Sequence, residues 1–128
     1  MKRVIDRATK YSTFVMNALA KRGHATNAEL LYDARAQYPD VSATTIHRIT
    51  SRLLLAGKVR LAPTGRDNAM RYDANIEPHD HFMCTVCERL RDAVFGSDIR
   101  DSIETHIGDG CSISGDLTVT GVCKYCKG

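Results

Sequence analysis

Residues 26–57 read TNAELLYDARAQYPDVSATTIHRITSRLLLAG, and the stretch carries the signals of two consecutive helices. Thr26, followed three residues later by Glu29, is a capping-box pattern that predicts the start of the first helix. Ser42 can cap the second helix, and Gly57 lies just past its end. The apolar residues at helical spacing in the second helix are Ile46, Ile49, Leu53 and Leu54.

The flanking sequence extends this pair of helices. Residues 7–23 have apolar side chains near helical spacing and end at Gly23, which predicts an earlier helix. Residues 58–63 and 69–74 flank the turn residues of 64–68 and read as a β-hairpin. Three helices and a hairpin predict a winged helix-turn-helix, in which the third helix enters the DNA major groove.

The charge is divided unevenly along the chain. Residues 1–76 contain 13 Lys and Arg against six Asp and Glu, whereas residues 77–128 contain five against nine. A net charge of +7 on the first part and −4 on the second indicates that the first part faces a polyanion. The alternative is an uneven but merely solvated surface.

The predicted third helix has side chains suited to duplex DNA. Arg48 can contact guanine with two hydrogen bonds, and short hydroxyls can hold phosphates or touch a thymine methyl. The alternative is an ordinary polar helix face. The candidate DNA-contacting residues of this helix and the hairpin are Thr44, Thr45, His47, Arg48, Lys58 and Arg60.

Residues 74–78 read as a linker, which predicts a DNA-binding domain at 1–76 and a second domain at 77–128. In the second domain, residues 81–86, 90–95 and 112–123 read as strands. A helix is expected over 97–108, capped by Ser97. The whole fold is therefore expected to be α+β. A unit of about 50 residues buries little core and usually needs a metal, a disulfide or a partner.

Two CxxC pairs are candidate ligands for such a metal. Cys84 and Cys87 form one pair, Cys123 and Cys126 the other, and together they can complete a closed tetrahedral zinc site. Redox motifs or disulfides are the alternatives. The fifth cysteine, Cys111, is interpreted as a small buried hydrophobic residue.

Residues 79–81 read His-Asp-His just before the first CxxC pair. In a strand, His79 and His81 share a face, and two imidazoles so placed are good ligands for a divalent transition metal. Carboxylates from Asp73 and Asp92 would shift the preference toward iron or manganese. The alternative is a set of ordinary polar surface groups.

Taken together, these motifs resemble the ferric uptake regulator family of bacterial metal-dependent repressors. The resemblance rests on HATNAELLYDARAQYPDVSATTIHR, AGKVRLAPTGRDNAMRYD, HDHFMCTVCERLRD and the terminal GVCKYC. It implies a homodimer that binds a double-stranded DNA operator, with a winged helix first, a dimerisation domain second and structural zinc on four cysteines. Because no signal-peptide pattern opens the sequence, a cytoplasmic protein is expected.

The resemblance also implies a regulatory metal site that draws on both domains, so that an ion would act as a clamp. Its ligands would be His24, Asp73, His79, His81 and Asp92. An aspartate at position 92 resembles the peroxide-sensing branch, whose iron form is oxidised at its own histidines, here His24 and His79. Regulation of iron or other metal uptake is the alternative.

Some positions depart from the family's pattern. His47 stands where a tyrosine is usual, and Ser12 where the first helix usually carries arginine. Ile99 and Gly115 stand where a further sensing site needs an acidic residue and a histidine, so Asp80 is expected to lack partners there. By the same resemblance, Arg7 is a minor-groove basic residue.

Two other classes of protein compete with a repressor. A metalloenzyme could use two histidines and a carboxylate, but no nucleophile or general base accompanies these ligands. An enzyme would also leave the basic helix-turn-helix unused. A structural zinc module that binds only protein is the second alternative, and DNA binding that responds to metal would exclude both. We therefore expect a repressor rather than an enzyme, with no membrane span and two metals per chain: one structural Zn²⁺ and one regulatory Fe²⁺ or Mn²⁺.

Overall fold

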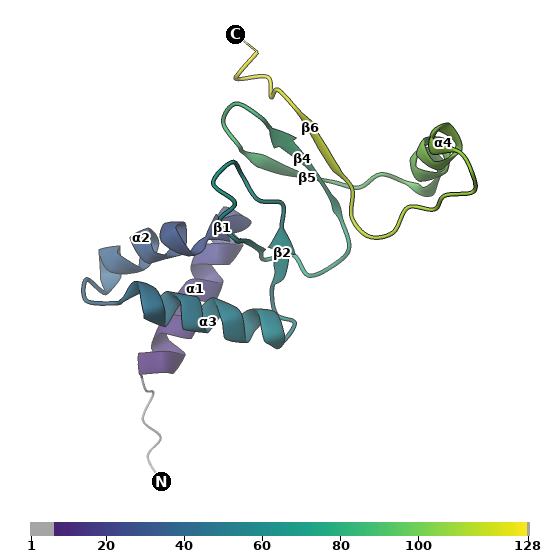
Figure 1. Ribbon diagram of the computed structural model, residues 1–128. Helices are drawn as coiled ribbons and strands as arrows, with labels where there is room; N and C mark the ends of the chain where they lie inside the picture. Colours follow the sequence, from purple (N-terminus) through teal and green to yellow (C-terminus); the bar gives the residue numbers. More distant parts are fainter. Residues whose placement is uncertain (1–6, 128) are drawn as a thin grey trace. The chain divides into compact units, whose positions relative to one another are not determined.

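The structure, a computed structural model, describes residues 7–127, with side chains from Lys10 onward. It forms two compact units, Met1–Ile76 and Glu77–Gly128. Three helices and one sheet form the first unit, and a second sheet with one helix forms the other, which confirms the α+β class (Figure 1). The elements are α1 (Arg7–Arg22), β1 (His24–Thr26), α2 (Asn27–Gln37), α3 (Ala43–Leu55), β2 (Arg60–Ala62), β3 (Arg71–Asp73), β4 (Asp80–Cys84), β5 (Leu90–Ala93), α4 (Ser97–Ile107) and β6 (Thr118–Gly121).

The helix boundaries of the first unit follow from local hydrogen bonds. The Thr26 hydroxyl accepts from the backbone N–H of Glu29 at 3.2 Å, and the Glu29 carboxylate accepts from the N–H of Thr26 at 2.9 Å. This is the predicted capping box of α2. Ser42 caps α3 in a similar way, since its hydroxyl accepts from the N–H of Thr45 at 3.1 Å.

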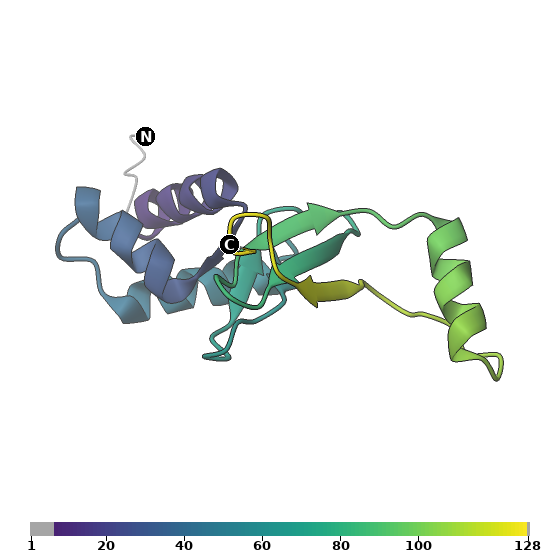
Figure 2. The same cartoon turned by 90° about the horizontal axis from the view of Figure 1, so that it is seen from above.

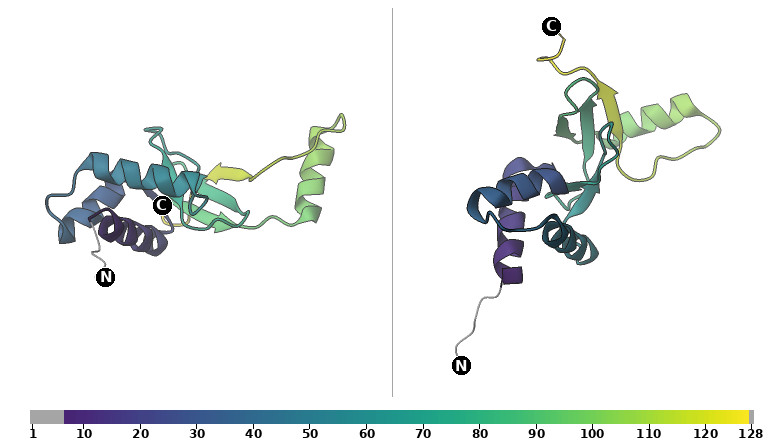
Figure 3. Two further views of the ribbon diagram at one scale, coloured as in Figure 1. Left: turned by 90° about the horizontal axis from the view of Figure 1, so that it is seen from below. Right: turned by 60° about the vertical axis from the view of Figure 1, so that its left-hand side comes forward.

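The three helices pack around one apolar core (Figures 1 and 3). On α3 the buried apolar residues are Ile46, Ile49 and Leu53, as the periodicity predicted, whereas Leu54 is only partly buried. The opposite face of α3 is therefore left to solvent. The buried core consists of Val15, Leu19, Ala25, Leu30, Ala34, Val41, Ile46, Ile49, Leu53, Val59 and Tyr72.

The wing is a three-stranded sheet in the order β1-β3-β2, with antiparallel neighbours. The predicted hairpin is present, and its turn contains Asn68 with a φ of 57°. The strand β1 was not predicted, because three residues between two helices show no alternation of polar and apolar side chains. Its pairing matters for the site, since it places His24 opposite Asp73.

The second unit is a sheet in the order β5-β4-β6, where β4 is antiparallel to β5 and parallel to β6. The crossover from β5 to β6 contains α4, which stands off from the sheet (Figure 2). The predicted cap on α4 is wrong: Gly96 is the N-cap, without a side-chain hydrogen bond, and Ser97 is already helical. Gly108 ends the helix, with a φ of 85°.

Apolar side chains of the second unit are largely exposed. No residue of α4 is buried, and Ile99, Ile103 and Ile107 are 47%, 36% and 59% exposed. Cys111 is also exposed, which corrects the prediction that it is buried. The neighbouring residues 109, 110 and 112 are exposed as well, so no part of the fold covers this turn. Among the residues that the structure describes, no helix has both the length and the apolar character needed to cross a membrane.

Candidate metal centres and nucleic-acid interface

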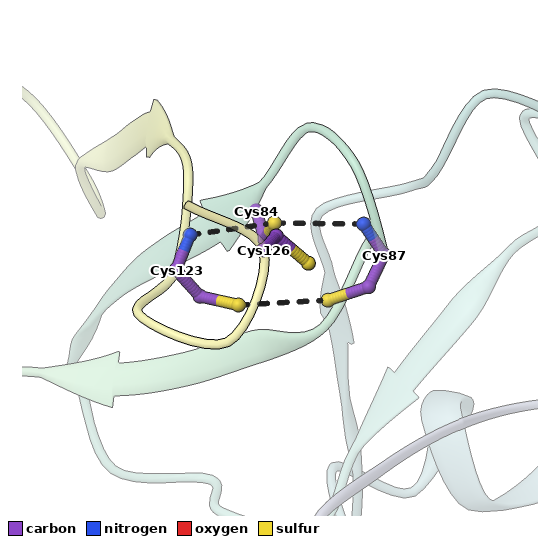
Figure 4. Close-up of side chains that lie close together, drawn as sticks. All are labelled: Cys84, Cys87, Cys123 and Cys126. Carbon is purple, nitrogen blue, oxygen red and sulfur yellow. Dashed lines mark hydrogen bonds between the residues drawn. The ribbon is translucent and has the colours of Figure 1, made fainter. Parts of the chain in front are cut away.

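The four paired cysteines converge where strands β4 and β6 of the second sheet end. Cys84 ends β4 and lies opposite Gly121 of the parallel strand β6, so the CxxC turns that follow the two strands meet. Their Sγ atoms lie within 4.8 Å of one another, and the Sγ atoms of Cys87 and Cys123 are 3.9 Å apart (Figure 4). Tetrahedral zinc with bonds of about 2.3 Å separates its sulfurs by roughly 3.8 Å. The arrangement therefore fits Zn²⁺.

Backbone amides prepare Cys84 to be a thiolate. Its buried Sγ accepts N–H groups from Val86 at 3.4 Å, from Cys87 at 3.5 Å and from Cys123 at 3.4 Å. These donors, that of Cys123 above all, lower the pKa of Cys84 to about 6. The hydrogen bond with Cys123, together with burial, raises the pKa of Cys126 to about 12. Four thiolates at this spacing would repel one another unless a cation lay among them, so the convergence of all four sulfurs fits a metal site.

The second unit also gathers two imidazoles and a carboxylate. His81 lies opposite Asp92 in the β4–β5 pair, and the rings of His79 and His81 are 4.6 Å apart between centroids. The Nε2 atoms of both histidines are 3.6 Å from Oδ1 of Asp92. These separations are too long for hydrogen bonds and suit three ligands around a shared cation.

The tautomer of His79 is fixed by its backbone surroundings. Its Nδ1 lies 2.7 Å from the carbonyl oxygen of Glu77, which can only accept, so Nδ1 carries the proton. The lone pair of His79 is therefore on Nε2, the atom nearest Asp92. A histidine held through one nitrogen by a carbonyl is the usual form of a metal-ligating imidazole.

The first unit also places a histidine beside an aspartate. His24 and Asp73 are partners across β1 and β3, with Nε2 of His24 3.5 Å from Oδ2 of Asp73. The other oxygen of Asp73 accepts the N–H of Asn75 at 2.9 Å, and the side chain is buried. In both units, strand register thus places a histidine beside an aspartate, and this donor set fits Fe²⁺ or Mn²⁺.

Asp80 faces away from these histidines and is held by hydrogen bonds and an ion pair within its own unit. Its buried carboxylate accepts the N–H groups of Phe95 and Leu117, each at 2.8 Å, and is paired with Arg100. Burial alone would raise the pKa of Asp80, but the two amides and the guanidinium hold it below the ordinary value. Arg100 also donates to the carbonyl of Gly115 at 3.1 Å. We call these contacts the Asp80 clasp.

The polar face of α3 holds most of the candidate DNA contacts. Thr44, His47 and Arg48 are exposed there, while Thr45 is half-buried and its N–H is used by the Ser42 cap. Lys58 is exposed just after α3, and Arg60 is half-buried in β2. Arg7 begins α1, but its side chain lies outside those described.

The sequence alone did not identify two residues that lie beside these sites. Asn27, at the start of α2, contacts His47, and Arg100 completes the Asp80 clasp. Both partners are distant in sequence, so no local pattern indicates them. Thr50 gave a weak signal for the first, because it is a polar residue among the buried positions of α3.

These features define a class of protein: a winged helix followed by a small sheet unit with a tetrathiolate site and paired histidine and aspartate ligands. The model of the ferric uptake regulator family matches residues 6–112, and the chain belongs to that family.

Individual relatives agree with the family. Ferric uptake regulation protein 1 of Mycolicibacterium fortuitum is 33% identical over 88 residues, which are 67% of this chain and 53% of that protein. The chain thus spans about half the length of that relative. Two solved structures share the fold. The Helicobacter pylori ferric uptake regulator has a TM-score of 0.73 at 22% identity, over 100% of this chain and 83% of its own. The Campylobacter jejuni peroxide stress regulator has a TM-score of 0.70 at 24% identity, over 94% and 91%.

Proposed function

We propose that the protein is a metal-dependent repressor that acts in the cytoplasm and binds a double-stranded operator as a homodimer. The observation that carries the proposal is the repeated pairing of histidine with aspartate by strand register, once in each unit. A single regulatory ion would take ligands from both pairs: His24, Asp73, His79, His81 and Asp92.

An ion shared in this way couples metal to DNA through population shift. The two units are joined at residues 76–77, and an ion bound by both sets of ligands favours the arrangements in which all of them reach it. If that arrangement also presents α3 to the operator, metal and DNA strengthen each other's binding by the same factor.

The exposed isoleucines of α4 support the homodimer. Ile99, Ile103 and Ile107 follow each other at four-residue spacing on a helix with no buried residue. A second copy of the chain that presents the same face would bury them in a symmetric interface. The dimer would then present two α3 helices to two operator half-sites.

DNA recognition is tested at Arg48. Arg48→Ala removes a side chain that can pair with guanine, so we expect relaxed specificity and a loss of roughly 1–3 kcal/mol in operator binding. Mobility shifts on operator and scrambled duplexes at one salt concentration measure both. An unchanged preference for the operator would show that α3 does not read the bases.

We propose further that the regulatory site senses hydrogen peroxide when it holds iron. Bound Fe²⁺ would supply the redox chemistry that activates peroxide beside the histidines that hold it. In the net reaction the imidazole gives up two electrons: one peroxide oxygen is added at a ring carbon, and the other leaves as water with the displaced hydrogen. His24 and His79 are the expected targets. Loss of His24 would leave Asp73 as the first unit's one proposed ligand and weaken the hold of the ion on that unit, so the repressor leaves DNA.

The test compares metals and one substitution. Iron-loaded and manganese-loaded protein receive the same low dose of peroxide, and mass spectrometry locates added oxygen while mobility shifts follow DNA release. We expect oxidation and release only with iron, because Mn²⁺ is a poor reductant of peroxide. Asp92→Glu keeps the carboxylate and restores the residue typical of iron-sensing relatives, so it should bind DNA with iron and resist oxidation.

Control of iron uptake is the second candidate, and the name of the Mycolicibacterium relative favours it. It predicts the same metal dependence without the oxidation. Iron-loaded protein that keeps intact histidines and stays on DNA after peroxide would reject the peroxide proposal in favour of this one.

A further inference from the structure

His47 lies on the exposed face of α3, and a side chain of another helix fixes its ring. Its Nδ1 atom is 3.2 Å from Nδ2 of Asn27, the first residue of α2. The other end of the Asn27 amide, Oδ1, accepts the hydroxyl of Thr50 at 2.8 Å. We call these three residues the Asn27 relay.

The donors and acceptors of the relay are assigned from Thr50, which is fully buried between the helices. Its hydroxyl has one proton, and Oδ1 of Asn27 is its nearest acceptor. The carbonyls of His47 and Ile46 are farther away, at 3.1 and 3.3 Å. The amide oxygen of Asn27 therefore faces Thr50, and its NH₂ group faces His47.

An amide NH₂ can only donate, so Nδ1 of His47 must offer its lone pair. The proton of the neutral ring is then on Nε2. Among the residues described by the structure, Nε2 of His47 has no hydrogen-bonded partner, and the side chain is exposed. The ring therefore presents a single, fixed N–H donor on the same face as Arg48.

We propose that His47 is a specificity-determining residue whose Nε2–H donates to an acceptor on the operator, with Asn27 and Thr50 as positioning residues. This rests on the proposed DNA-binding function. In the major groove such a donor pairs with N7 or O6 of guanine, N7 of adenine or O4 of thymine. It cannot pair with the amino group of cytosine, so cytosine is excluded at the contacted position. A phosphate oxygen offers the same acceptor chemistry without base selection.

The tautomer is tested first, on the full-length, metal-loaded protein with ¹⁵N-labelled histidine. The two ring nitrogens have distinct NMR shifts, and the relay predicts that Nε2 of His47 carries the proton. Thr50→Val keeps the shape of the side chain but removes the hydroxyl, so it should produce a mixture of tautomers. Thr105→Val removes a hydroxyl that bonds to the Asp101 carbonyl on α4 and serves as the control. A proton on Nδ1 in the unaltered protein overturns the relay.

The donor is tested by two amide substitutions of His47. An asparagine amide reaches about as far as Nδ1, so His47→Asn should keep the contact with Asn27 and lose the outward donor. A glutamine amide reaches about as far as Nε2, so His47→Gln should keep the donor. In selection from duplexes randomised over the half-site, we expect His47→Asn to bind roughly tenfold more weakly and to accept cytosine, while His47→Gln stays near the unaltered protein.

The possible outcomes distinguish a base contact from a phosphate contact, and the role of His47 from the proposed DNA-binding function. Loss of affinity at one base pair supports the specificity role. An equal loss on all sequences assigns a phosphate contact and overturns that role. Binding by His47→Asn that matches the unaltered protein overturns the proposal for His47 alone. Unaltered, metal-loaded protein that binds no duplex overturns the proposed function itself.

Discussion

The two units are held together by different forces. The first unit buries eleven apolar residues in one core, whereas Cys84, a candidate ligand, is the one buried apolar residue in the described part of the second. Burial of a large aliphatic or aromatic side chain contributes about 1.5–3 kcal/mol. We therefore expect the first unit to be stabilised mainly by its core, and the second to depend on bound metal, on the Asp80 clasp and on a partner. The comparison predicts that changes will affect the units separately.

The largest effect is expected from the zinc ligands. Cys123→Ser replaces a thiolate by a hydroxyl that stays neutral, and structural zinc contributes on the order of 10 kcal/mol in small domains. The variant should lose zinc and unfold in its second unit, while α1, α2 and α3 keep their protection from hydrogen exchange. Zinc analysis and exchange monitored by mass spectrometry measure both.

The exposed Cys111 provides the control for that prediction. Cys111→Ser changes a thiol outside the tetrathiolate site, so zinc content and exchange should match the unaltered protein. A Cys123→Ser protein that remains a stable dimer with full protection would mean that the second unit does not need its zinc.

Shortening a core side chain should destabilise the first unit and leave the second unit folded. Leu30 is fully buried between the helices, so Leu30→Ala should destabilise the first unit by about 2–5 kcal/mol through lost contacts and a cavity. Leu55, which is 89% exposed, provides the matched control, and Leu55→Ala should change stability little. Urea unfolding followed by exchange should show early loss in the helices with zinc still bound; zinc release at the same urea concentration would show that the units unfold together.

A smaller loss is expected at the Asp80 clasp. Arg100→Ala leaves the buried carboxylate with two amide donors only, and a hydrogen bond to a charged group contributes about 1.5–3 kcal/mol. Because Asp80 lies between His79 and His81, the variant should also bind Mn²⁺ more weakly. Arg91→Ala, at an exposed arginine on β5, is the control. Thermal unfolding measures the loss of stability, and calorimetric titration measures the affinity for Mn²⁺. If Arg100 formed only a surface ion pair, its removal would change neither the unfolding temperature nor the affinity.

The sequence predicted the parts of this fold that depend on local signals. The Thr26 capping box and the apolar face of α3 follow from residues within four positions of each other, and both are present in the structure. The α+β class followed from the order of such elements. The matched CxxC spacing likewise indicated which four cysteines would meet.

What the sequence did not reveal depends on contacts between distant residues. The strand β1 exists because β3 pairs with it, and Asp80 is satisfied by Arg100, twenty residues away. Cys111 is exposed together with the residues around it, which a lone cysteine in the sequence does not indicate. Periodicity shows that a helix has an apolar face, but not whether its own chain or a second copy covers that face.

The smallest effect is expected from a single phosphate contact of the first unit. Lys58 is exposed, and its backbone is fixed at the end of α3 by a 2.9 Å hydrogen bond from its N–H to the carbonyl of Leu53. If its ammonium group neutralises one phosphate, Lys58→Ala removes one released counterion per protomer. The slope of log K against log salt should then become less negative by about 0.9 for each contact, equally on operator and scrambled duplexes. Lys127→Ala, in the acidic second unit, should leave the slope unchanged. A loss confined to the operator would mean that Lys58 contacts a base, and equal slopes for both variants would mean that the basic surface of the first unit does not face DNA at Lys58.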